Sequence, residues 1–139
     1  MEDLKEGKLT VECRRRDHRA LHLHWLGESS DQEPARFLTA HFDRVLKEAA
    51  SCEEVILDFQ DITFMNSATT EPLLRFIKGM EKAPSRLRLV YDETKLWQRA
   101  MFRCYKIIFH SNDNIIIEAS TDSASADGPR SREASAVEG

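Results

Sequence analysis

The chain has 139 residues, of which 41% are hydrophobic and 32% are charged, and its formal net charge is −4 at pH 7. This composition is typical of one globular domain that buries a core without crosslinks, and the charge gives no general attraction to nucleic acid. No apolar run approaches the roughly 20 residues that a membrane-spanning helix needs, and the first residues do not resemble a signal peptide. With three widely spaced cysteines, we expect a cytoplasmic protein with reduced thiols, no membrane partner and no nucleic-acid partner.

The first part of the chain predicts an antiparallel hairpin. Residues 9–13 and 21–26 alternate apolar and polar side chains, as strands with one buried face do. The predicted turn between them holds a basic cluster, which consists of Arg14, Arg15, Arg16, His18 and Arg19. Because no aromatic side chains are interleaved to stack on bases, a solvated hairpin tip explains the cluster better than a nucleic-acid site.

Helical and strand patterns alternate in the next part of the chain. A loop at residues 27–33 precedes a helix that begins at Pro34, and residues 55–59 form a short apolar strand typical of a sheet centre. The remaining predicted elements are helices at residues 73–80 and 96–104 and strands at residues 87–91 and 115–117. This order predicts an α/β fold with a single mixed β-sheet, parallel crossovers at its centre and helices packed on it.

The last residues differ in composition from the rest. Residues 121–139 contain no aromatic residue and one sizeable aliphatic residue, Val137, among many Ser, Ala and Asp. Such a segment cannot bury enough apolar surface to offset its conformational entropy. We therefore expect one domain at residues 1–120 and a disordered C-terminal tail at residues 121–139.

Small polar side chains gather where the predicted central strand gives way to the following helix. The run is Asn66, Ser67, Ala68, Thr69 and Thr70. Free backbone N–H groups and the positive end of the helix dipole converge at such a junction, which favours an anion or a capping oxygen. Two interpretations stay open: the side chains only cap the helix, or they form a site where a phosphoserine would add about −1.5 to −2 charges.

The run from Leu57 to Ser67, LDFQDITFMNS, followed by a helix with Leu73 and Leu74, resembles the signature of the STAS domain family, the anti-sigma-factor antagonists and their relatives. The resemblance implies a single mixed β-sheet with helices packed mainly on one face. It also implies a non-enzymatic regulatory domain that binds a partner protein. In that family a partner kinase, which doubles as the anti-sigma factor, phosphorylates a serine at the strand–helix junction, and we expect a phosphatase to reverse this step.

The residues of the signature match that family unevenly. Ser67 stands at the phospho-acceptor position, whereas Asn66 stands where the family usually has aspartate. Ala68 replaces a second serine, and Thr69 replaces a glycine that would let backbones approach closely. These departures leave the predicted fold intact and bear on the chemistry of the partner.

Pro72 is a further departure from the family pattern. In a helix that begins directly after Ser67, its ring would crowd the carbonyl of Ala68. Either the helix begins later, near Thr69 or Thr70, or its first turn is distorted, and both threonines become rival phosphate acceptors or caps. The predicted partner-binding residues are Asn66, Ser67, Thr69, Thr70 and Glu71.

Three histidines and one tryptophan are further candidates for a functional role. His22 and His24 share one strand face, as metal ligands could, but no tight motif joins them to a further ligand, so an exposed strand face is the simpler interpretation and no metal site is predicted. His41 lies on an apolar helix stripe and is expected to be partly buried with a hydrogen-bond partner. Trp97 is expected to be part of the core, and the STAS resemblance offers a role in the partner interface as the alternative.

The sequence contains no recognisable catalytic set. It has no G-x-S-x-G, P-loop or glycine-rich dinucleotide turn. Asp58 and Asp61 could act as paired carboxylates, but a strand end and the turn after it explain them more simply. We therefore expect no catalytic residues and no cofactor. The alternative to a phosphorylation-controlled regulator is a constitutive protein-interaction or small-ligand-binding scaffold on the same fold.

Overall fold

The computed structural model describes residues 1–17 and 19–120 of the chain. His18 and the predicted C-terminal tail, residues 121–139, lie outside the described residues, so the disorder of the tail stays a prediction. The three cysteines are free thiols.

The described residues form a six-stranded sheet and three helices. In chain order the elements are β1 (Leu4–Glu6), β2 (Leu9–Arg16), β3 (Ala20–Ser29), α1 (Ala35–Ala49), β4 (Glu54–Met65), α2 (Ser67–Met80), β5 (Arg86–Tyr91), α3 (Leu96–Ile108) and β6 (Ile115–Ala119). The strands lie in the order of the chain, with antiparallel pairing from β1 to β3 and parallel pairing from β3 to β6. The predicted α/β fold with a mixed sheet is confirmed, and the 55–59 strand lies centrally, within β4.

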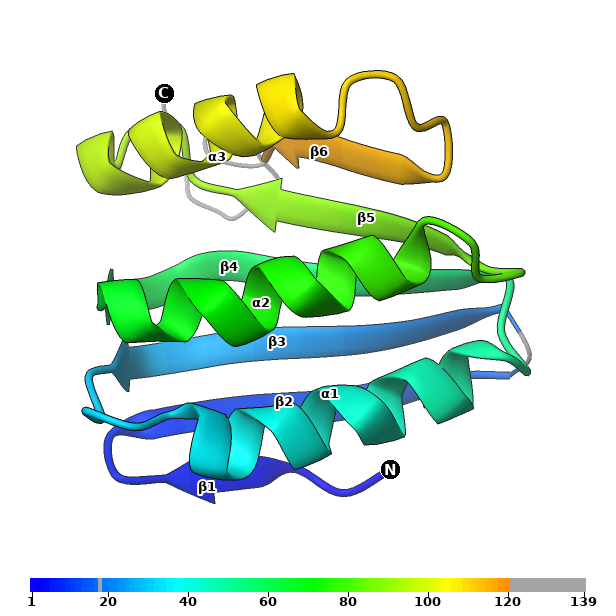
Figure 1. Cartoon of the computed structure of the whole chain (residues 1–139). Coiled ribbons are helices and arrows are strands. Elements are labelled where there is room, and N and C mark those ends of the chain that lie inside the picture. The colour runs from blue at the N-terminus through cyan, green and yellow to red at the C-terminus, as the bar shows by residue number, and fades with distance from the viewer. Residues whose placement is uncertain (18, 121–139) are drawn as a thin grey trace, which may run out of the picture.

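All three helices pack against the same face of the sheet (Figure 1). Along β3 and β4, alternate side chains point into this layer, and Leu23, Trp25, Leu57 and Phe59 are fully buried there. Aromatic rings from the helices complete the core, and Phe42 of α1 stacks on Trp25 and on Phe76 of α2. The side chains of the other face are half-exposed and include both polar and apolar residues. Burial of the apolar set on one face therefore fixes the register of the strands.

Both central strands run further than the sequence predicts. Strand β3 continues to Ser29, through part of the predicted 27–33 loop, and β4 continues to Met65. Asp58 and Asp61 consequently lie inside β4, and the prediction of a strand end and turn there is wrong. Register irregularities between β3 and β4 interrupt the two-residue alternation, which hides the strand in the sequence. The short strand β1 was not predicted.

Gly27 allows β3 to pass close to the preceding hairpin. Its φ is +87°, and a Cβ atom placed there would lie 2.0 Å from the backbone oxygen of Lys8. The same oxygen accepts a hydrogen bond from the Glu28 N–H at 3.1 Å. Glycine is therefore required at this point for β3 to reach Ser29, which lies beside the start of α2.

Candidate functional site

Asn66 is the N-cap of α2, and the helix begins at Ser67. The Asn66 Oδ1 atom accepts hydrogen bonds from the backbone N–H of Thr69 at 3.1 Å and from its hydroxyl at 2.7 Å. The Asn66 Nδ2 atom donates to the backbone oxygen of Asp31 at 2.8 Å. The amide side chain thus caps α2 and also ties it to the loop before α1. A helix beginning near Thr69 or Thr70 was the wrong alternative.

The helix tolerates Pro72 as its sixth residue. Pro72 is buried, and it has no N–H group to donate to the carbonyl of Ala68. The first turn is tight, because the Thr69 N–H also approaches the Asn66 backbone oxygen at 3.2 Å, a bond between residues three apart. The side-chain cap at Asn66 stabilises a helix start that contains this interruption.

Two hydroxyls face inward beneath the junction. Thr69 and Ser29 have exposed fractions of 0% and 2%, and their hydroxyl oxygens lie 2.6 Å apart. Since the Thr69 hydroxyl donates to Asn66, the Ser29 hydroxyl donates to Thr69. Thr69, which the sequence presents as a rival phosphate acceptor, is therefore part of the interior that joins β3 to α2.

The remaining predicted site residues face outward. Ser67 is exposed, and its hydroxyl has no hydrogen-bond partner among the described residues. Thr70 is half-buried, and Glu71 is exposed and lies 3.7 Å from the Arg75 guanidinium. The structure thus brings the five predicted residues together at one helix terminus, but it divides them into an inner pair, Asn66 and Thr69, and an outer set.

An open groove of about 540 Å³ extends from the junction between α2 and the end of α3. Leu74, Ile108 and Phe109 form its apolar part, and Ser67 and Thr70 line the same groove. Ile107 and Ile108 are 70% and 54% exposed. The sequence prediction did not include these α3 residues. The sequence signal that could have identified them is the adjacent pair Ile107 and Ile108, because the apolar stripe of one helix face normally includes only one of two neighbouring residues.

Tyr105 and Trp97 lie on the same helix α3. Burial raises the pKa of the Tyr105 hydroxyl to about 12, although the neighbouring Thr70 hydroxyl acts in the opposite direction. Trp97 is partly buried and packs against the core, which agrees with the core interpretation of this residue.

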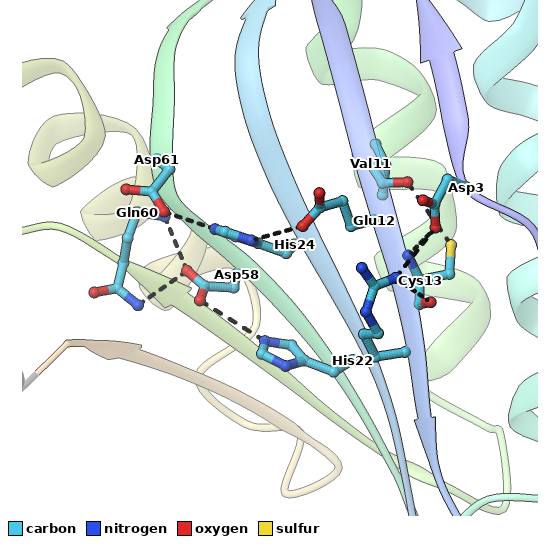
Figure 2. A network of polar contacts seen from close by, with 10 residues as sticks. Asp3, Val11, Glu12, Cys13, His22, His24, Asp58, Gln60 and Asp61 are labelled. Atoms are coloured by element: carbon cyan, nitrogen blue, oxygen red, sulfur yellow. Dashed lines mark hydrogen bonds and ion pairs between the residues drawn. The ribbon is translucent and has the colours of Figure 1, made fainter.

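The uncovered face of the sheet carries a network of histidines and carboxylates (Figure 2). His24 lies between Asp61 and Glu12, with nitrogen–oxygen distances of 2.7 and 3.5 Å, and His22 Nε2 lies 3.7 Å from Asp58 Oδ2. Burial alone would raise the pKa of Asp58, but the nearby His22 ring and the hydrogen bonds from Gln60 lower it below its usual range. Among residues 1–17 and 19–120, no three His, Cys, Asp or Glu side chains form a metal-ion cluster. The two histidines serve as partners of carboxylates.

His41 differs from its prediction. Its exposed fraction is 0%, and neither ring nitrogen has a hydrogen-bond partner within the described part of the chain. Burial, assisted by the charge of Arg44, lowers the pKa of His41 to about 4. The ring lies 5.5 Å from Phe42, so this histidine is a neutral aromatic side chain of the core. The expected hydrogen-bond partner is not found among the described residues, because this position lies on the buried, largely apolar stripe of α1.

Comparison with known proteins identifies relatives by fold. No family model matches the chain, and no curated protein sequence matches it. The fold is similar to that of the anti-sigma factor antagonist SpoIIAA in its unphosphorylated form, with a TM-score of 0.55 and 14% identity over 80% of this chain and 89% of SpoIIAA. Phosphorylated SpoIIAA from Bacillus gives a TM-score of 0.57 and 14% identity over 81% and 92% of the two chains.

An anti-sigma factor antagonist from Mycobacterium paratuberculosis gives a TM-score of 0.57 at 14% identity, over 78% of this chain and 85% of that protein. Similarity at this level concerns the fold, and the chain therefore has a STAS-like fold, that of the anti-sigma factor antagonists. In the described residues, no helix has the length and apolar character needed to cross a membrane.

Proposed function

We propose that this STAS-like domain is a non-enzymatic regulator that binds a partner protein through the outer side of the junction, and that phosphorylation of Ser67 controls the binding. One observation carries the proposal. The Asn66 side chain caps α2 by accepting from Thr69, and the Ser67 hydroxyl is exposed and has no hydrogen-bond partner in the described chain. A serine that the helix does not need, at a helix N-terminus, is available for modification.

The position of Ser67 suits a phosphate that changes the surface rather than the fold. The helix dipole stabilises a negative charge at this terminus by about 0.3–1 kcal/mol. A phosphate adds about −1.5 to −2 charges, and Glu71, one turn further along the helix, adds another negative charge to the same surface. Facing an apolar or acidic partner, such a desolvated dianion changes the affinity about 100-fold, which corresponds to roughly 3 kcal/mol.

Burial ranks the three candidate acceptors. Ser67 is exposed, Thr70 is half-buried, and Thr69 is fully buried, with its hydroxyl bonded to Asn66 and close to Ser29. A kinase must reach the oxygen that it phosphorylates. Ser67 is therefore the first candidate, Thr70 the second, and Thr69 the last.

The apolar groove beside Ser67 supports a protein as the partner. Exposed aliphatic side chains at Ile107 and Ile108 and the adjoining Leu74 offer a contact surface that ends at the acceptor serine. By the STAS resemblance, the partner is a cytoplasmic kinase that also acts as an anti-sigma-factor-like target, and a phosphatase restores the unmodified form. The similarity to SpoIIAA, a protein known in an unphosphorylated and a phosphorylated form, supports this cycle. Neither a cofactor nor a nucleic acid takes part.

The second candidate is a constitutive protein-interaction or small-ligand-binding scaffold without phosphorylation. Asn66 favours it, because this residue replaces the family's aspartate and both polar atoms of its side chain are engaged in holding the fold. A partner would then bind the same groove whatever the state of Ser67.

The two candidates differ in how partner binding responds to charge at Ser67. The experiment is capture of partners from the native cells with the full chain and with Ser67→Ala, Ser67→Asp and Thr70→Ala, using Ser111→Asp as the control at an exposed serine in the turn after α3. We expect Ser67→Ala to retain the partner and Ser67→Asp to lose most of it, with Ser111→Asp unchanged. Equal capture by all variants contradicts phosphorylation control and supports the scaffold.

A further inference from the structure

A cavity lined by arginines lies at the opposite end of the sheet from Ser67. Its volume is about 670 Å³, and its walls come from the β2–β3 turn and the starts of β4 and β5. Ser67, by contrast, follows the end of β4. The arginines of the cavity are Arg16, Arg19, Arg86 and Arg88. Two of them belong to the basic cluster of the hairpin, and the other two come from a strand about 70 residues later in the chain.

The strand register explains how these arginines meet. Arg16 pairs with Ala20, Ala20 with Glu54, and Glu54 with Arg86, so these residues form one row across the sheet. Their side chains belong to the uncovered face, because the alternate positions Leu21, Val55 and Leu87 are buried under the helices. Arg88 lies two residues further along β5, on the same face.

Three of the four guanidinium groups have no carboxylate within ion-pair distance in the described part of the chain. Arg88 is held by Glu54 at 3.0 Å and by Glu118 at 2.9 Å. Within residues 1–17 and 19–120, no side chain lies within ion-pair distance of Arg16, Arg19 or Arg86. Cations gathered around one cavity repel each other, and an anion bound among them removes that repulsion.

The arginines of the hairpin turn are not all equally solvated, as Arg15 shows. Arg15 points to the other side of the hairpin, where it bonds Glu48 at 2.6 Å and the Ser51 hydroxyl at 2.8 Å. This anchors the turn and leaves Arg16 and Arg19 beside the cavity. The basic cluster is thus divided between a structural residue and two residues that line a hollow.

Backbone hydrogen bonds hold the walls of the cavity together. The N–H groups of Glu53 and Glu54 donate to the Arg19 oxygen at 3.0 and 2.8 Å, and the Arg86 N–H donates to the Glu53 oxygen at 2.9 Å. Three segments far apart in the sequence are therefore fixed around the cavity before any ligand binds, which lowers the entropy cost of binding.

We propose that this cavity binds a small organic phosphate that carries hydroxyl groups. Guanidinium groups match phosphate oxygens in charge and geometry. The carboxylates of Asp17 and Glu53 also line the cavity and can accept hydrogen bonds from hydroxyls, whereas they would repel a long polyanion such as a nucleic-acid strand. The volume lies within the roughly 300–1,000 Å³ of small-molecule sites and exceeds what inorganic phosphate fills.

The test is an NMR titration of the full chain with inorganic phosphate and with glucose 6-phosphate at constant ionic strength. We expect saturable shifts at residues 16–20, 53–54 and 86–88, with the sugar phosphate binding more tightly. Arg86→Gln and Arg19→Gln should each raise Kd for both probes about tenfold, while Arg103→Gln, the same change on exposed α3, leaves it within about twofold. Glu53→Gln should weaken the sugar phosphate relative to inorganic phosphate, because it removes a hydroxyl acceptor and a charge that repels both anions.

Three results would overturn this inference. The first is the absence of saturable shifts at these residues up to about 10 mM of either probe, a limit that corresponds to very weak binding. The second is an equal loss of binding in Arg103→Gln and Arg86→Gln, which indicates general charge attraction. The third is binding of inorganic phosphate and sugar phosphate with the same Kd, which contradicts a role for the carboxylates. Since Ser67 lies at the other end of the sheet, none of these results depends on the proposed phosphorylation.

Discussion

The inner and outer sides of the β4–α2 junction consist of similar residues in different environments. On the inner side, Asn66 and Thr69 bond each other and Ser29 beneath the helix start. On the outer side, Ser67 and Glu71 face solvent. Four of the five residues from 66 to 70 have polar side chains, but these side chains differ in burial and in whether they bond to the rest of the fold. The inner side is bonded into the fold, whereas the outer side is exposed. We therefore expect a change of charge on the outer side to leave the fold intact.

This comparison assigns the cap to Asn66 and leaves the adjacent Ser67 as the proposed site of modification. Asn66 supplies the cap, so the Ser67 hydroxyl is not needed for it. The predictions that follow test the division, beginning with the interior, where the energies are largest.

His41 is also a polar side chain of the interior, but unlike Thr69 it has no hydrogen-bond partner among the described residues. The pKa of His41 is lowered from 6.5 to about 4 in the folded state, so the unfolded chain takes up a proton first as the pH falls. Stability is therefore complete above pH 6.5 and declines towards pH 4, by about 3 kcal/mol from this residue.

Urea unfolding at several pH values measures this loss. His41→Leu should remove most of the decline between pH 6.5 and pH 4. His110→Gln, an exposed histidine, serves as the control and should retain it. If the His41→Leu curve keeps the slope of the parent, His41 is not a buried neutral group.

Thr69→Val tests the inner hydroxyl directly. Valine keeps the shape but removes the bonds to Asn66 and Ser29, and we expect a loss of about 2 kcal/mol in the free energy of unfolding. Thr39→Val, at an exposed position of α1, should change it by less than about 0.5 kcal/mol. Equal effects of the two substitutions would remove the distinction between inner and outer hydroxyls.

Asn66→Ala removes the cap and the bond to the Asp31 carbonyl, and should cost about 1 kcal/mol in chemical denaturation. Asn66→Asp provides the comparison, because it keeps a capping oxygen and gains from the helix dipole while it loses the Asp31 bond. We expect Asn66→Asp to lie within about 0.5 kcal/mol of the parent. A loss as large as that of Asn66→Ala would mean that the Asp31 bond, rather than the cap, is the stabilising interaction.

Ser67→Ala should have the smallest effect, a change in unfolding free energy of less than about 0.5 kcal/mol. The reason is that the Ser67 hydroxyl has no partner within the described chain. The same denaturation series checks it beside Asn66→Ala. A loss of about 1 kcal/mol or more would identify Ser67 as a cap and would contradict the division of the junction.

More of the fold than of the candidate site could be predicted from the sequence. Apolar periodicity identifies the buried faces of β3, β4 and the helices, because burial of those faces is what forms the sheet. The full length of β4 could not be predicted, since the irregular register opposite residues 24–28 of β3 breaks the alternation. The short strand β1 was missed because three residues, Leu4–Glu6, carry too little pattern.

At the site, residue types indicated a junction that favours caps or anions but could not rank Ser67, Thr69 and Thr70. That ranking depends on which way each side chain points, and hence on the phase of α2. Pro72 suggested a later helix start, and the side-chain cap at Asn66 allows the earlier one. The arginine cavity was also beyond prediction, because it depends on pairing between β4 and β5 across 30 residues.

The central claim is that Ser67 is a regulatory hydroxyl. Its most direct test is phosphopeptide mapping of the full chain isolated from its native cells, beside Ser67→Ala and Thr70→Ala isolated in the same way. We expect a phosphate on Ser67 in the parent and in Thr70→Ala, and none at residues 66–70 in Ser67→Ala. Absence of phosphate from all three proteins, under conditions in which the parent releases and rebinds its partner, would contradict it.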